Sequence, residues 1–271
     1  MNNRPHPRRL AVLSSLAILA SLAAPSQAPA QAADAPWPAL QKSYFAGKTL
    51  EPAPFIHLTA PVRAASGDQV PFAFSIDHPQ TESRYIKSVS LFVDGNPVPL
   101  TAVFHFTPHS GKAEISTRIR LESDSPVHVV AEANDGKLYV NEVMVKASGG
   151  CSGPPTGDDA GARAAAGKMK LALEGAFKPG EITRATLLIR HPMNTGMQRD
   201  PFTHGFRPAY FIDKIAVTYN GKPVMTADTA IGVSENPSIR FGFVADKPGT
   251  LQIVAHDSEG GSFRQAMQVG G

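Results

Sequence analysis

The sequence predicts an all-β protein with two immunoglobulin-like antiparallel β-sandwich domains joined by a flexible linker rich in Gly, Ala and Pro. Three observations lead to this prediction. Beyond Pro36, apolar and polar residues alternate in short runs, as in half-buried strands, and no run of about twelve residues carries a helical stripe. The 271 residues include 23 Gly and 24 Pro, which suits many short strands and turns. The two halves of the chain also repeat one another, so the length holds two similar domains.

The first half contains three clear alternating runs, over residues 70–76, 89–93 and 115–121. In the third run the apolar side chains are interleaved with four charged ones, Glu114, Arg118, Arg120 and Glu122. The dipeptide Asp94-Gly95 follows the second run and predicts a hairpin turn with positive φ. These runs are therefore expected to be antiparallel strands with one face in the core.

The second half repeats this pattern with its turns in register. Residues 86–98 align with 212–224, and residues 127–145 align with 251–269. In both alignments the glycine-containing turns coincide. Matched turns at nearly constant spacing favour a true repeat over shared composition.

One insertion distinguishes the second copy from the first. The dipeptides His78-Pro79 and His191-Pro192 correspond and indicate a structural corner, after which the second copy has additional residues around 193–211. The insertion mixes Met and Arg side chains. It is predicted to be either a surface for a partner or a cover for a sheet edge.

The N-terminus has the layout of a secretory signal peptide over residues 1–32. Basic residues precede an apolar stretch over 10–24, and Ala30-Gln31-Ala32 offers a cleavage site. We expect export to the periplasm, by the general secretory route or, given the Arg8-Arg9 pair, the twin-arginine route. Removing this segment leaves 23 basic against 23 acidic residues. We therefore expect no nucleic-acid partner, and no membrane binding after signal cleavage.

The rest of the chain divides at a segment without large apolar residues. Residues 33–147 form the first predicted sandwich, residues 148–167 the linker and residues 168–271 the second sandwich. Because Gly, Ala, Pro and Ser dominate the linker, it is not expected to bury enough surface to become ordered.

The linker contains Cys151, the only cysteine of the sequence. A single cysteine excludes a disulfide framework, a CxxC redox site and an all-thiolate metal site. Gly149, Gly150, Ser152 and Gly153 surround it, so we expect its thiol to be exposed on a flexible arm. Counted from the last predicted strand, this arm would reach about 20 Å at ~3.3–3.6 Å per residue.

The surroundings of Cys151 predict a carried group rather than catalysis. A catalytic thiolate needs a His, a cation or a helix N-terminus beside it, and the nearest upstream charge in sequence is Lys146. A flexible arm would also fail to hold a nucleophile and a base in reacting geometry. A copper site would need His or Met shortly after the Cys, and His105 and His109 suit a solvated strand end better than a metal site. We predict no enzymatic activity, no metal and no cofactor other than a group bound covalently to Cys151.

Several strings of residues then resemble a known family. In the first copy these are Leu58-Thr59-Ala60-Pro61 and the Gly149-Gly150-Cys151 arm directly after the last strand. In the second copy they are the strings over residues 191–196, 208–212, 219–222 and 234–237. The chain resembles a fusion of SoxY and SoxZ, the two subunits of the sulfur-oxidation carrier, over nearly all of its mature length.

This resemblance implies a periplasmic, non-catalytic carrier whose Cys151 bears a covalent sulfur intermediate while partner enzymes load, oxidise and hydrolyse it. The chain departs from the SoxY pattern because its arm reads Gly-Gly-Cys-Ser-Gly and continues into a second domain. Fused carriers of this kind accompany quinoprotein alcohol dehydrogenases, so the expected partners are enzymes of sulfur oxidation or enzymes associated with such a dehydrogenase.

Two other classes of function stay open on the sequence alone. One is a periplasmic immunoglobulin-like scaffold or binding module in which the cysteine carries no sulfur intermediate. The other is a thiol redox sensor that signals through an intermolecular disulfide. The state of Cys151 in the native protein separates all three.

Overall fold

The computed structural model describes residues 1–2, 36–155 and 158–270. The predicted signal peptide lies outside the described residues apart from its first two, and it stays a prediction. In the part of the chain that the structure describes, no helix is both long and apolar enough to cross a membrane.

The first copy contributes one helix, one 3₁₀ turn and eight strands. In chain order they are α1 (Pro36–Phe45), β1 (Leu50–Pro52), β2 (Ile56–Thr59), β3 (Val70–Ile76), β4 (Ile86–Val93), β5 (Leu100–Phe106), η1 (Pro108–Ser110), β6 (Glu114–Ile119), β7 (Ser125–Ala133) and β8 (Leu138–Val145). The three alternating runs of the first half correspond to β3, to the second part of β4 and to β6 with the residues that follow it.

The second copy contributes one short helix and seven strands. They are α2 (Asp159–Ala164), β9 (Met169–Glu174), β10 (Ile182–Ile189), β11 (Ile212–Tyr219), β12 (Lys222–Thr229), β13 (Ser238–Val244), β14 (Gly249–Asp257) and β15 (Ser262–Val269). The two aligned segment pairs contain β4 with β11, β7 with β14 and β8 with β15.

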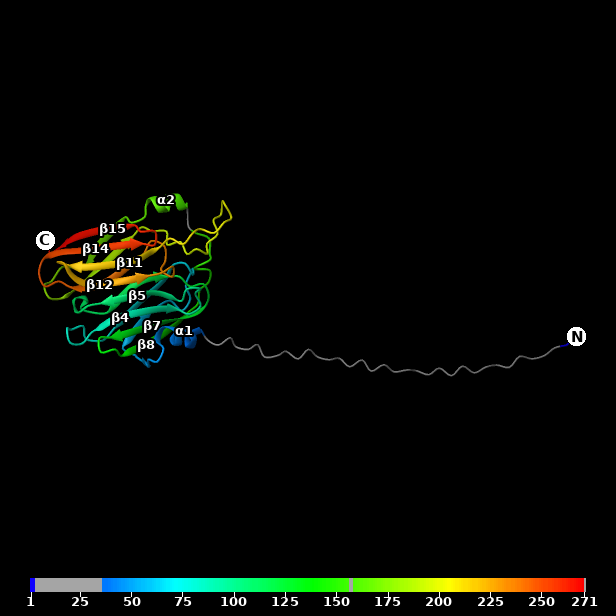
Figure 1. The fold of residues 1–271 in the computed structure, drawn as a ribbon, viewed down its shortest axis with the longest axis horizontal. Helices are drawn as coiled ribbons and strands as arrows, with labels where there is room; N and C mark the ends of the chain where they lie inside the picture. Colours follow the sequence, from blue (N-terminus) through cyan, green and yellow to red (C-terminus); the bar gives the residue numbers. More distant parts are fainter. Residues whose placement is uncertain (3–35, 156–157, 271) are drawn as a thin grey trace. The chain divides into compact units, whose positions relative to one another are not determined.

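The strands of both copies form two sheets. The nine-stranded sheet has the order β1-β8-β7-β4-β5-β12-β11-β14-β15, and the six-stranded sheet has the order β2-β3-β6-β13-β10-β9. Figure 1 shows the strands of the first copy, in cyan and green, continuing directly into those of the second, in yellow to red. The prediction of an all-β, immunoglobulin-like sandwich architecture is therefore confirmed.

Both sheets are continuous across the two copies, which the sequence did not indicate. Strand β5 pairs with β12, and strand β6 pairs with β13, both antiparallel. Because these strands are equivalent in the repeat, the strand order on one side of each junction mirrors the order on the other, as at the interface of a two-fold dimer. The junction removes four strand edges that would otherwise be free to pair with other chains.

A single apolar core lies between the two sheets. Large, fully buried side chains from both copies contribute to it, including Phe72 and Phe104 from the first and Phe241 and Phe243 from the second. Strands such as β3 and β10 alternate buried and more exposed residues, whereas β7 has a run of five buried residues. The predicted period-two pattern thus corresponds to the inner and outer faces of the sheets.

The two predicted hairpin turns differ in conformation. Asn220 and Gly221 both have positive φ, 48° and 78°, as a tight hairpin turn requires. Gly95 does not, so the prediction of positive φ was wrong there. A Cβ atom at Gly95 would lie 2.6 Å from the Ser123 hydroxyl oxygen, so close packing explains this glycine.

Candidate functional site

The cysteine arm, residues 148–153, runs beside the chain that leaves β6. The Gly149 N–H donates to the Glu122 carbonyl at 2.9 Å, and the Gly150 N–H donates to the Leu121 carbonyl at 3.0 Å. Within the arm, the Gly153 N–H donates to the Gly149 carbonyl at 3.0 Å. Backbone hydrogen bonds therefore order this segment although it has almost no apolar side chains.

The two glycines before the cysteine have different structural roles. A Cβ atom at Gly150 would lie 2.2 Å from the Gly67 carbonyl oxygen and 2.6 Å from the Leu121 carbonyl oxygen. Gly149 has a φ of 70°, and a Cβ atom there would meet nothing within 4 Å. Gly150 thus allows two backbones to approach, whereas Gly149 supplies a backbone conformation that favours glycine.

Glu122 is the main anchor of the arm. Its Oε2 accepts hydrogen bonds from the Cys151 N–H at 2.8 Å and the Ser152 N–H at 3.0 Å, and its Oε1 accepts from the Ser152 hydroxyl. Burial raises the pKa of Glu122, but the hydrogen bonds from the Ser152 side chain and from the two N–H groups outweigh it, so the net pKa lies below its usual value. Glu122 therefore stays ionised at neutral pH and binds the arm through charge-assisted hydrogen bonds.

The thiol of Cys151 is buried, with an exposed fraction of 1% for the residue. The expectation of an exposed thiol was wrong for this conformation, because backbone contacts hold the arm against the sandwich. Burial raises the pKa of Cys151 to about 11, the negative charge of Glu122 raises it further, and Arg120 opposes the rise. The thiol is accordingly protonated and unreactive at neutral pH while the arm is docked.

Arg120 connects the arm to the second copy. It is 2% exposed, its Nη1 donates to the Gly150 carbonyl at 2.9 Å and its Nη2 donates to the Met193 carbonyl at 3.3 Å. Burial lowers the pKa of the guanidinium, and Cys151 in its thiolate form and the carboxylates of Asp68 and Glu235 oppose this. An arginine remains charged after such a shift, so Arg120 is a buried cation held between the two copies.

The insertion of the second copy binds the arm directly. The Thr195 hydroxyl donates to the Cys151 carbonyl at 2.7 Å, and the Met197 N–H donates to the Thr195 hydroxyl at 3.1 Å. Met193 is fully buried, and its sulfur accepts from the Ile212 N–H at 3.2 Å. The insertion was predicted to be a surface for a partner or a cover for a sheet edge. The structure shows a third role, because the insertion binds the cysteine arm.

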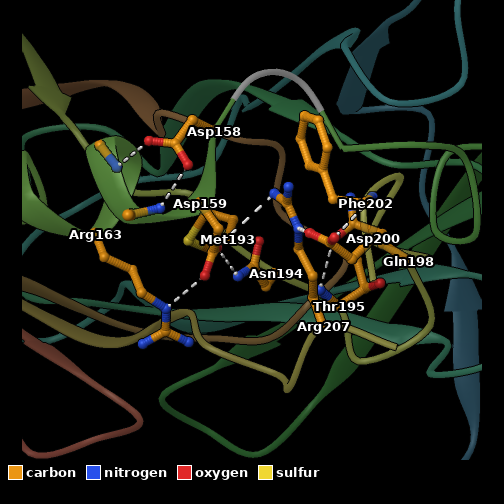
Figure 2. A network of polar contacts seen from close by, with 12 residues as sticks. Asp158, Asp159, Arg163, Met193, Asn194, Thr195, Gln198, Asp200, Phe202 and Arg207 are labelled. Carbon is orange, nitrogen blue, oxygen red and sulfur yellow. Dashed lines mark hydrogen bonds and ion pairs between the residues drawn. The ribbon is translucent and has the colours of Figure 1, made fainter. Parts of the chain in front are cut away.

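A polar network fixes the insertion to the helix that follows the arm (Figure 2). The Asn194 side-chain amide donates to Asp159 of α2 at 2.8 Å, and the Arg207 guanidinium donates to Asp200 at 3.0 Å and lies 3.8 Å from Asp159. Asp158 caps α2 by accepting from the N–H groups of the first helical turn. The insertion thereby contacts the chain both at Cys151 and shortly after it.

Three of the strings that carry the family resemblance meet behind this contact. His191 is fully buried, its ring centre lies 4.3 Å from that of Tyr210, and its carbonyl accepts from the Asn236 N–H at 2.9 Å. Burial lowers the pKa of His191 to about 4, a neighbouring Asp257 opposes this and Arg163 adds to it. The ring is therefore neutral and structural, as the corner prediction for His191-Pro192 had it.

The sequence indicated some of these residues and not others. Gly149, Gly150, Ser152 and Gly153 all lie in the docked arm around Cys151. Arg120 and Glu122 appeared only as polar positions of an alternating run, and nothing in that pattern distinguished them from the polar face of any strand. In the described part of the chain, no group of three or more His, Cys, Asp or Glu side chains is placed to bind a metal ion.

Fold and site together define a two-copy β-sandwich protein that holds one thiol on an arm between its copies. Comparison of the chain with known protein families then identifies the family to which it belongs. Residues 41–151 match the family of the sulfur oxidation protein SoxY, and residues 171–268 match that of the sulphur oxidation protein SoxZ. The chain belongs to the SoxY–SoxZ sulfur-oxidation carriers, with both partners fused in one chain. This family consists of carrier proteins rather than catalysts.

Solved structures show more distant similarity. The sulfur carrier protein SoxY from Chlorobium limicola f thiosulfatophilum is 26% identical over 41% of this chain and 90% of its own, with a TM-score of 0.35. A superoxide reductase (neelaredoxin) from Ignicoccus hospitalis is 15% identical over 34% of this chain and 80% of its own, with a TM-score of 0.32. No curated protein matches the chain.

Proposed function

We propose that Cys151 is the site at which this carrier binds its sulfur intermediate covalently, and that the carrier works in the periplasm. The observation that carries the proposal is the position of the only cysteine. It is the last residue of the SoxY match, on an arm that both copies of the sandwich hold. The signal-peptide pattern of residues 1–32 supports the location.

The docked conformation is a storage state in this proposal. A buried, protonated thiol is a poor nucleophile and is shielded from oxidants, which suits an exported protein with one unpaired cysteine. Loading then requires the arm to leave its site. Undocking breaks the hydrogen bonds from Cys151 and Ser152 to Glu122 and the contacts of Arg120 and Thr195 with the arm.

Undocking also restores the reactivity of the thiol. Away from Glu122 and from the buried site, its pKa returns from about 11 toward its ordinary 9.0, which raises the thiolate fraction at neutral pH about 100-fold. An extended arm places the sulfur about 20 Å from the sandwich, at ~3.3–3.6 Å per residue. A partner that binds the undocked arm would supply the base that takes the thiol proton.

The partners we propose are periplasmic enzymes of sulfur oxidation, or the enzymes that accompany a quinoprotein dehydrogenase. They would load the sulfur group, oxidise it and remove it, while the carrier presents it. The proposed site requires neither nucleic acid nor a membrane. Cys151 binds the group, and Gly149, Gly150, Ser152 and Gly153 give the arm its two positions.

Intact mass of the protein isolated from its own host without reductant tests this function. We expect sulfane-sulfur or thiosulfonate adducts that disappear on reduction, map to the peptide containing Cys151 and are absent from Cys151→Ser. A uniformly free thiol while the partner enzymes are active would overturn the proposal. A covalent dimer through Cys151 would do so as well, because it indicates a redox sensor.

A further inference from the structure

The outer face of the six-stranded sheet carries a basic groove at the end where the cysteine arm lies. We define the basic groove by Arg118, Lys168, Lys170, Leu188, Arg190 and Asn236, which line a hollow of about 410 Å³ together with neighbouring residues. A second hollow shares Lys168, Arg190 and Asn236 and extends toward α2. The groove therefore lies on the exposed side of the sheet, away from the apolar core.

Strand pairing fixes the positions of the four cationic residues. Lys170 of β9 lies opposite Leu188 of β10, and just beyond these strands the Arg190 N–H donates to the Lys168 carbonyl at 2.8 Å. Arg118 comes from β6, two strands further across the sheet, and donates to the Asn236 carbonyl at 2.9 Å. Both copies thus contribute cations to one surface.

The charges of this groove differ from those elsewhere on the same sheet face. Nearer the other end of the sheet, Arg184 pairs with Glu114 at 2.6 Å and Arg240 pairs with Glu174 at 2.7 Å. Within the described residues, none of the four cations of the basic groove forms an ion pair with a carboxylate. One acidic residue, Glu235, lines the adjoining hollow. The sheet therefore neutralises its arginines in one place and leaves cations available in another.

The dimensions of the groove indicate the class of ligand. Strands β9 and β6 are separated by β10 and β13, so at ~4.8 Å per strand the backbones at Lys170 and Arg118 lie about 14 Å apart. Between them lies Leu188, an apolar side chain that is 41% exposed. An extended ligand with separated negative charges and an apolar group between them matches this arrangement.

We propose that the basic groove docks an acidic segment of a partner protein, in which carboxylates flank an apolar side chain that covers Leu188. Arg118 lies in β6 and precedes Arg120 by two residues; Arg120 directly follows the end of that strand and binds the cysteine arm. A segment in the groove is thereby placed beside the arm. The binding itself needs no sulfur chemistry, so it is independent of the function proposed for Cys151.

A labelled peptide tests this proposal on the full mature chain. The probe is an acetylated, amidated Glu-Glu-Leu-Glu-Glu peptide, and binding is followed by fluorescence anisotropy at low and at moderate salt, with both wild type and Cys151→Ser. We expect equal binding to these two proteins, weakening with salt, and a loss of at least about tenfold in the double variant Lys168→Glu/Lys170→Glu.

Matched variants separate the groove from net charge. Lys137→Glu/Lys222→Glu changes the same number of charges at two exposed positions, one in the turn before β8 and one at the start of β12, and is expected to bind the peptide like wild type. Leu188→Ser is expected to weaken peptide binding severalfold, because it removes the exposed apolar side chain that the leucine of the peptide covers. Equal losses in the two double variants would overturn the proposal, because the effect would then be net charge alone. Binding of sulfate or of phosphatidylglycerol vesicles at the groove, with no binding of the peptide, would overturn it too.

Discussion

The two copies of the sandwich differ most where their His-Pro dipeptides occur. In the first copy, His78-Pro79 lies near the surface, the His78 Nδ1 is 2.8 Å from the Pro79 carbonyl oxygen, and the chain passes on to β4. In the second copy, His191 is buried against Tyr210, and the chain enters the insertion before β11. The His-Pro dipeptide thus belongs to a simple connection between strands in the first copy, whereas in the second copy it leads into the insertion that binds the cysteine arm.

This difference shows that the repeated strands form the framework, whereas the segments that are not repeated form the site. The repeated strands build two continuous sheets, and neither copy needs a functional residue for that. The site arises where the symmetry fails, because only the first copy continues into a cysteine arm and only the second carries the insertion that binds it. Each copy therefore contributes half of the docking site.

The largest effect is expected from the glycine that lets the arm approach the first copy. In Gly150→Ala the new Cβ would lie 2.2 Å from the Gly67 carbonyl oxygen, so the arm cannot dock. We expect the rate of Cys151 alkylation by iodoacetamide at neutral pH to rise about 100-fold or more, toward that of the unfolded chain. The far-ultraviolet circular dichroism should stay unchanged, because the arm contributes no strand to either sheet.

Gly149→Ala is the matched control for this variant. Its Cβ meets nothing within 4 Å, so the cost is limited to ~1–2 kcal/mol for a positive φ. We expect a clearly smaller increase in alkylation than for Gly150→Ala. Equal effects at both positions would mean that the glycines serve only flexibility.

A smaller effect is expected from the contact that the second copy makes. Thr195→Val keeps the shape of the side chain but removes the hydroxyl that donates to the Cys151 carbonyl, and a buried acceptor without a partner costs ~1–3 kcal/mol. We expect alkylation of Cys151 to accelerate about tenfold. Thr218→Val, in β11, makes the same chemical change away from the arm. If both variants behaved like wild type, the insertion would not hold the arm.

The sequence predicted the framework better than the site. Alternation of apolar residues located the strands, and aligned turns revealed the repeat, because both depend on side chains that the sequence displays directly. The continuous sheets depend on backbone pairing between β5 and β12 and between β6 and β13, which side-chain patterns do not encode.

The docking of the arm was not predicted from the sequence, because it also depends on backbone hydrogen bonds. Its glycines suggested mobility, since they have no side chains to pack. In the structure the same backbone donates hydrogen bonds to Glu122 and accepts them from Arg120 and Thr195. A segment without apolar side chains can thus be ordered entirely by partners that are distant in sequence.

The pH dependence of Cys151 alkylation in the wild-type protein tests most directly that the thiol is stored docked and used undocked. The docked pKa is raised from 9.0 to about 11, so docking is fully favoured below pH 9 and is lost progressively as the pH rises from 9 to about 11. The account predicts slow alkylation at neutral pH, an increase of about tenfold per pH unit, and a plateau only near pH 11. A rate equal to that of the unfolded chain, with a plateau near pH 9, would contradict it.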